Sequence, residues 1–89
     1  MNNPIKLRLG VVQQAVGEVL MLMDANQGRY LELNETGALI LNALLAGANA
    51  QQAAEQLSAI YQVSVTQALD DVSKLTDDLI EAQLMEMPN

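Results

Sequence analysis

The sequence contains neither cysteine nor histidine among its 89 residues, and these two absences remove several kinds of chemistry. Without cysteine, disulfides and thiolate metal sites are excluded, and the cytoplasm is the expected compartment. Without histidine, the chain lacks the commonest general base, the commonest transition-metal ligand and the usual activator of a nucleophilic serine. There is also no phosphate-binding glycine loop. We therefore expect no enzymatic activity, no metal and no cofactor.

Basic and aromatic residues are scarce. Four Lys and Arg stand against eleven Asp and Glu, which gives a net charge of −7, and only Tyr30 and Tyr61 are aromatic. Such a surface is repelled by phosphate backbones and by anionic lipid. No tract reaches the roughly 18 apolar residues that span a bilayer, and the N-terminus does not resemble a secretory signal. Neither a nucleic acid nor a membrane is expected as a partner, and the length predicts one domain over residues 1–89.

The clearest local pattern runs from residue 29 to residue 37. Residues 29–33 alternate between polar and apolar side chains, which predicts a strand with one buried and one exposed face. Asn34 ends this alternation and is a favoured residue for capping the N-terminus of a helix. Glu35 would then place a negative charge in the first helical turn, where the helix dipole favours it. The chain therefore changes from strand to helix at Asn34.

Two further strands are expected before this point. The first lies within residues 7–16, where the chain either stays extended or bends at Gly10. The second covers residues 18–24 and is apolar on both faces, which is typical of a central or doubly covered strand. Residues 24–28 are rich in turn formers, so strands 18–24 and 29–33 should pair as a hairpin. Strand 29–33 is then an edge of the sheet.

Three helices are expected after Asn34. The first spans residues 35–46 and stops at Gly47; the second spans 50–61 with Asn49 as its cap; the third begins at Ser64, which has capping-box spacing with Gln67. Residues at helical spacing predict the buried side of the second helix: Ala53, Ala54, Leu57, Ile60 and Tyr61. A longer stripe does so for the third: Val65, Ala68, Leu69, Val72, Leu75, Leu79 and Ala82. The tail at 84–89 is either a last extended piece or frayed.

The predicted fold is therefore α+β, with a three-stranded antiparallel sheet followed by a three-helix bundle, as in a winged helix-turn-helix. Nucleic-acid recognition by the third helix is disfavoured, because that helix carries five acidic residues and one lysine. A metal site on this helix is also disfavoured. Asp70 and Asp77, like Asp71 and Asp78, are seven residues apart, and such residues are separated by about 10.5 Å along a helix, too far to bind the same ion. Acyl carrier proteins are also small, acidic and helical. Their attachment signature, Asp-Ser-Leu at the start of a helix, does not occur in this sequence, so this class is disfavoured.

Strand 29–33 carries the remaining functional signal. An edge strand exposes backbone groups that proteins normally protect, and Arg29 and Glu32 would supply such protection. Alternatively, the edge accepts an extended peptide as an added strand, with the third helix forming the second wall of a groove. Two copies pairing through this edge would instead form a structural dimerisation module. The residues alone indicate a small peptide-binding or adaptor domain.

Several segments together resemble the PqqD-like family of precursor-peptide recognition domains. The likeness covers most of the chain beyond Gly10, namely residues 19–24, 28–38, 40, 44–47, 53–57, 61–63, 71–72 and 75–79. The resemblance implies a RiPP recognition element, a non-catalytic domain that binds the leader of a ribosomally made, post-translationally modified peptide. The implied peptide-binding residues are Arg29, Tyr30, Leu31, Glu32 and Leu33 on the strand and Asp71, Lys74, Leu75 and Asp78 on the helix.

Within this family, the chain is most similar to the free-standing recognition proteins of lasso-peptide biosynthesis. These add the precursor leader to the edge strand, here residues 29–33, and deliver the precursor to a separate leader peptidase. Relatives that serve pyrroloquinoline quinone synthesis carry a Tyr-Pro-Glu-like segment at the end of the second strand. This chain has Leu-Met-Asp there, at residues 22–24, which argues against that pathway. The usual glycine near the end of the third helix is replaced by Ala82 and Gln83. An adaptor for a radical SAM enzyme or another modifying enzyme remains the alternative.

Overall fold

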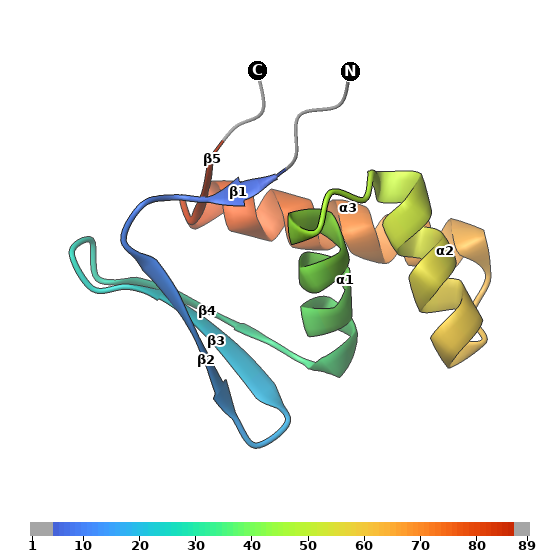
Figure 1. The fold of residues 1–89 in the computed structure, drawn as a ribbon, viewed down its shortest axis with the longest axis horizontal. Coiled ribbons are helices and arrows are strands. Elements are labelled where there is room, and N and C mark those ends of the chain that lie inside the picture. The colour runs from blue at the N-terminus through green and yellow to red at the C-terminus, as the bar shows by residue number, and fades with distance from the viewer. Residues whose placement is uncertain (1–4, 87–89) are drawn as a thin grey trace.

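The computed structural model describes residues 5–86 and consists of a small antiparallel sheet packed against three helices (Figure 1). The elements follow in the order β1 (Lys6–Leu7), β2 (Val11–Val16), β3 (Val19–Asp24), β4 (Arg29–Leu33), α1 (Glu35–Leu45), α2 (Ala50–Tyr61), α3 (Val65–Glu81) and β5 (Met85–Glu86). The main sheet has the strand order β2-β3-β4. The predicted α+β fold, three antiparallel strands followed by three helices, is therefore confirmed.

The two short strands β1 and β5 were not predicted as a pair. They lie side by side as a separate antiparallel ladder, with Lys6 opposite Glu86 and Leu7 opposite Met85. The chain bends at Gly10 (φ +95°), so the expected first strand is divided into β1 and β2. The tail begins as an extended piece, and residues 87–89 lie outside the described part of the chain.

The core lies between the sheet and the helices. Leu22 and Leu33 supply it from β3 and β4, and Leu41, Leu57 and Leu79 supply it from the three helices; all five are at most 5% exposed. In Figure 1, α1 stands beside the sheet and α2 lies at the opposite end of the molecule. The alternation of residues 29–33 is confirmed, because Leu33 is buried and Leu31 partly buried while Tyr30 and Glu32 are exposed.

The helix boundaries follow local capping signals. The Asn49 side chain accepts a hydrogen bond from the Gln52 N–H, and the Gln52 side chain accepts one from the Asn49 N–H, so the complete capping box opens α2. At α3 the Ser64 hydroxyl accepts from the Gln67 N–H, but the Gln67 amide donates to Asp71 instead. The capping box expected at Ser64 is therefore only half formed.

Two side chains differ from the sequence prediction in their burial. Ile60 was assigned to the buried side of α2 but is 60% exposed, and Tyr61 packs against the core from the same last turn. Asp24 was assigned to a turn but is only 5% exposed. Its carboxylate accepts hydrogen bonds from the Asn26 and Gln27 N–H groups, which meets the requirement of a buried polar group for partners.

The two-residue turn between β2 and β3 fixes the hydrogen-bonding phase of the sheet. Gly17 has φ +61°, and the turn that contains it closes on the opposed residues Val16 and Val19. The closing residues of such a turn exchange backbone hydrogen bonds, and bonded positions then alternate along the ladder. The Val11 N–H fits this phase, since it donates to the Arg8 carbonyl oxygen at 3.1 Å, outside the β2–β3 ladder.

The same phase determines which backbone groups lie at the two outer edges. β3 is central, so its residues that do not bond β2 bond β4, in the pairs Leu20–Leu33, Leu22–Leu31 and Asp24–Arg29. The N–H and C=O groups of Tyr30 and Glu32 must then point away from β3, toward the open edge of β4. On β2, the corresponding outward residues are Gln13 and Ala15.

The junction between β4 and α1 depends on Asn34. Its side-chain oxygen accepts hydrogen bonds from the Gly37 N–H at 2.9 Å and from the Thr36 hydroxyl at 3.0 Å. We expect Asn34→Ala to lower the free energy of unfolding by about 1 kcal/mol, because the cap is lost. Urea denaturation measures this loss. Asn42→Ala, an exposed position within α1, should leave stability unchanged or raise it, because alanine is the better helix former. Equal losses in the two variants would contradict a capping role.

None of the helices in residues 5–86 is both long enough and apolar enough to cross a membrane.

Candidate functional site

A cleft of about 490 Å³ separates β4 from α3. Leu33 and Leu75 form its apolar floor, and these two side chains are only 5% and 6% exposed. The remaining lining residues come from the start of β3, the end of β4, the cap and first two turns of α1, and the polar side of α3. They are Val19, Glu32, Asn34, Thr36, Gly37, Ile40, Asp71, Lys74 and Asp78. The first turn of α1 therefore contributes to the cleft as well as the strand and helix that form its walls.

A second depression continues the cleft toward the end of α3. It is lined by Leu31, Asp78, Glu81 and Ala82, so Asp78 borders both hollows. Together they follow β4 from Leu33 back to Leu31 on one side and α3 on the other. We name this continuous feature the β4–α3 groove.

The structure brings seven of the nine predicted site residues to this groove. On the strand these are Leu31, Glu32 and Leu33, and on the helix they are Asp71, Lys74, Leu75 and Asp78. Tyr30 and Arg29 do not line it. The Tyr30 side chain lies on the outer face of the sheet and is 65% exposed, although its backbone groups face the groove edge. Arg29 lies on the inner face, and its Nε is buried without a hydrogen-bond partner among residues 5–86.

Sequence reasoning missed the contribution of α1. Asn34, Thr36, Gly37 and Ile40 border the groove because α1 turns back across the end of β4 immediately after the cap. The Asn34 cap was visible in the sequence and marks this reversal. The direction in which α1 leaves the strand was not, because that direction depends on how the helix packs against the sheet.

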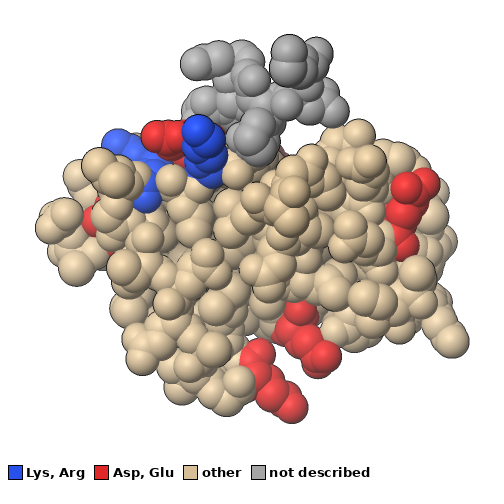
Figure 2. All heavy atoms as spheres, in the orientation of Figure 1, with Lys and Arg blue, Asp and Glu red and all other residues tan. Residues whose placement is uncertain are grey.

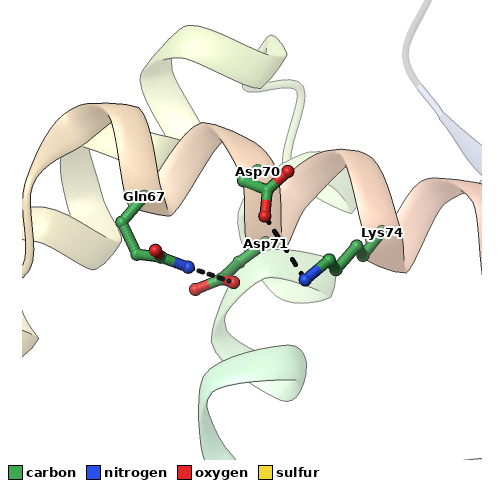
Figure 3. Close-up of polar contacts among 4 residues, drawn as sticks. All are labelled: Gln67, Asp70, Asp71 and Lys74. Atoms are coloured by element: carbon green, nitrogen blue, oxygen red, sulfur yellow. Dashed lines mark hydrogen bonds and ion pairs between the residues drawn. The ribbon is translucent and has the colours of Figure 1, made fainter.

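The groove is acidic, with one cation that is already paired. Asp71, Asp78 and Glu32 contribute carboxylates, whereas Lys74 forms an ion pair with Asp70 at 3.3 Å on the exposed face of α3 (Figure 3). The pair's side chains are 71% and 58% exposed, so solvent screens it and its contribution to stability is small. The Asp71 carboxylate accepts a hydrogen bond from the Gln67 amide at 3.1 Å, one turn earlier.

The groove combines an apolar floor, acidic rims and an open strand edge. Within the described residues, no group of three or more Asp or Glu side chains is arranged to hold a metal ion. The backbone N–H and C=O groups of Tyr30 and Glu32 point away from β3, at the open edge of the sheet along one side of the groove. This is the arrangement that receives an extended peptide as an additional strand.

The family model for coenzyme PQQ synthesis protein D (PqqD) matches residues 20–85, which include the whole groove apart from Val19. The chain belongs to the PqqD family. Among curated protein sequences, no relative of this PqqD-family chain was found. The predicted resemblance to PqqD-like recognition domains is confirmed.

Two solved structures share the fold of this PqqD-family chain. The first is a lasso peptide synthetase B1 complexed with the leader peptide; it has a TM-score of 0.88 and 29% sequence identity, and the match covers 96% of this chain and all of the other. The second is TbiB1 in complex with the TbiA(beta) leader peptide, with a TM-score of 0.80 and 22% identity over 91% of this chain and 94% of the other. At 22% identity the second match establishes the fold alone.

Proposed function

We propose that this PqqD-family chain is a non-catalytic recognition domain that binds the leader of a ribosomally made precursor peptide. The leader adds as a strand to the open edge of β4, and its side chains enter the β4–α3 groove. The observation that carries this proposal is the outward direction of the Tyr30 and Glu32 backbone groups beside an apolar-floored groove. The solved structure that is 29% identical is described as complexed with the leader peptide, which supports the same ligand class.

Binding energy should come from two sources. An added strand satisfies the outward N–H and C=O groups of Tyr30 and Glu32, and each net hydrogen bond is worth about 1 kcal/mol. Alternate leader side chains would cover Leu33 and Leu75 on the groove floor, and apolar burial contributes about 25 cal/mol per Å² before ordering costs. Because only two residues of β4 have outward N–H and C=O groups, backbone pairing alone cannot give tight binding. The apolar floor must supply most of the affinity.

The proposal is tested by titration combined with hydrogen exchange. A fluorescently labelled synthetic leader, taken from a short precursor-like reading frame encoded beside this protein, should bind saturably in an anisotropy assay. On binding, amide exchange should slow at Tyr30 and Glu32, whose N–H groups become hydrogen-bonded. It should change less at Leu31 and Leu33, which are already bonded to β3. Saturable binding that leaves the Tyr30 and Glu32 amides unchanged would contradict strand addition.

Delivery to a modifying enzyme is the second part of the proposal. We propose a lasso-peptide pathway, in which a separate leader peptidase acts on the precursor while this chain holds its leader. The 29% identity to a lasso peptide synthetase B1 over nearly the whole chain supports that choice. Cleavage of the precursor by the peptidase encoded nearby should accelerate when this chain is added. If cleavage is equally fast without it, the delivery step is wrong, although leader binding would stand.

The acidic groove predicts a charge preference in the leader. A leader with Lys or Arg near the groove should bind more weakly as salt rises, because exposed charges are screened over about 8–10 Å at physiological ionic strength. We expect the double variant Asp71→Asn with Asp78→Asn to weaken such a leader about three- to tenfold at low salt, since each exposed ion pair contributes about 0.2–1 kcal/mol. The same double variant should flatten the salt dependence.

Asp77 provides the matched control for this prediction. It is an exposed aspartate on the same helix but does not line the groove. Asp77→Asn should therefore change the affinity and its salt dependence much less than the double variant does. If all aspartates of α3 contribute equally, the leader senses the overall charge of the chain rather than the groove.

A further inference from the structure

The second open edge of the sheet, on β2, has no charged residue. β2 reads Val-Val-Gln-Gln-Ala-Val, and five of its six residues are exposed. Proteins usually protect such an edge with charges, proline or a covering segment. Arg29 and Glu32 provide charge on β4, whereas β2 pairs only with β3 among the described strands and carries none of these protections. Figure 2 shows that the visible face has few charged side chains, with its Lys and Arg gathered at one end.

The backbone of β2 offers a specific set of unpaired groups. The N–H and C=O groups of Gln13 and Ala15 point outward, because the hydrogen-bonding phase of the sheet directs those of Val12, Gln14 and Val16 toward β3. Val11 also faces outward, but its N–H is already bonded to Arg8. A strand that pairs with this edge therefore finds donors and acceptors at Gln13 and Ala15.

We propose that this edge pairs with β2 of a second copy of the chain, antiparallel, about a two-fold axis at Gln14. In this register Gln13 lies opposite Ala15 of the second copy, and Ala15 lies opposite its Gln13. These two positions then form four backbone hydrogen bonds and leave the Val11 N–H with Arg8. A register centred on Gln13 would instead place Val11 opposite Ala15 and require that occupied N–H. Of these two registers, the structure therefore favours the one centred on Gln14.

The side chains fit the same arrangement. On the outer face of the sheet, Val12 would lie opposite Val16 of the second copy, and the Val12 and Val16 side chains are 55% and 54% exposed in the single chain. β-Branched side chains opposite each other stabilise antiparallel strands. The two Gln14 side chains would meet at the axis, where their amides can hydrogen-bond. The two three-stranded sheets would form one continuous six-stranded sheet.

Charges at the ends of β2 favour a second copy over an unrelated strand. Exposed Arg8 precedes the strand, and exposed Glu18 follows it in the hairpin turn. Antiparallel pairing brings Glu18 of each copy toward Arg8 of the other, so the strand is complementary to itself. The edge of β4, where the leader is proposed to bind, stays open in this dimer, because β2 and β4 form opposite edges of the sheet. The dimer does not depend on the proposed leader recognition.

A charge swap at Gln14 tests the proposal. Sedimentation of the full chain should show a concentration-dependent monomer–dimer equilibrium that strengthens with added salt, because each copy has a net charge of −7. Gln14→Lys and Gln14→Glu should each raise the dimer dissociation constant at least tenfold, since like charges would meet at the axis. An equimolar mixture of the two variants should form dimers again.

Two further variants keep the test independent of side-chain charge. Gln13→Pro removes an outward N–H of β2 and should also abolish the dimer, whereas Glu32→Pro on the other edge should leave it unchanged. Circular dichroism establishes that each variant is folded. A chain that stays monomeric at millimolar concentration overturns the proposal. So does a dimer that survives Gln14→Lys and Gln14→Glu equally, because a different surface would then be responsible.

Discussion

Replacing Glu32 with proline should weaken leader binding about 10- to 100-fold while changing the free energy of unfolding by less than about 1 kcal/mol. The Glu32 N–H points to the open edge of β4, so proline removes no bond within the hairpin. In the complex, however, β4 then lacks one N–H donor, and the carbonyl group of the leader strand that would accept from it has no partner. An unsatisfied buried acceptor costs about 1–3 kcal/mol.

Two controls separate the backbone effect from other consequences of this change. Glu32→Ala removes the carboxylate but keeps the N–H, so it should retain most of the affinity. Gln13→Pro places the same ring on the opposite edge of the sheet and should leave leader affinity unchanged. Anisotropy titrations measure the affinities, and urea denaturation shows whether each variant is folded. If Glu32→Pro binds as tightly as the unaltered chain, the leader does not pair with β4.

Truncation of two leucines one turn apart on α3 should separate folding from binding. Leu79 is fully buried and does not line the groove, whereas Leu75 is 6% exposed and forms part of the groove floor. Leu79→Ala should lower the free energy of unfolding by about 2–5 kcal/mol through the lost burial and the cavity left behind. That is a large share of the 5–15 kcal/mol typical of a folded domain.

Leu75→Ala should lower both stability and affinity. We expect a stability loss at the lower end of the same range and a further five- to thirtyfold loss of leader affinity, because the peptide would lose apolar contact on the groove floor. Binding is compared at a temperature where urea denaturation shows both variants to be fully folded. Equal leader affinities for the folded Leu75→Ala and Leu79→Ala chains would rule out Leu75 as part of the binding surface.

The alternation of residues 29–33 predicts both leucines of β4 on the buried face of the strand, and the fold distinguishes them. Leu33 is buried beneath the first turn of α1, whereas Leu31 is only partly buried and lines the second hollow of the groove. Replacing Leu33 should therefore mainly unfold the chain, as the alternation predicted. Leu31 belongs to the proposed peptide surface as well as to the core.

The sequence by itself determined the features that depend on near neighbours. The change from strand to helix at Asn34, the strand bounds at residues 29–33 and the apolar stripe of α3 all follow from capping, period-2 alternation and 3.6-residue periodicity. Each of these signals lies within a single element, so it can be recognised without knowledge of any tertiary contact. They also indicated β3 as the central strand, because it is apolar on both faces.

Only the tertiary structure decided how distant segments meet. It paired β1 with β5, which lie near opposite ends of the sequence. It also placed the first turn of α1 beside the groove. It also buried Asp24 and left Ile60 exposed. Helical phase gives the angle between residues of one helix but not the direction in which that helix faces a strand some forty residues earlier. That direction is set by the packing of the whole core, and no local pattern contains it.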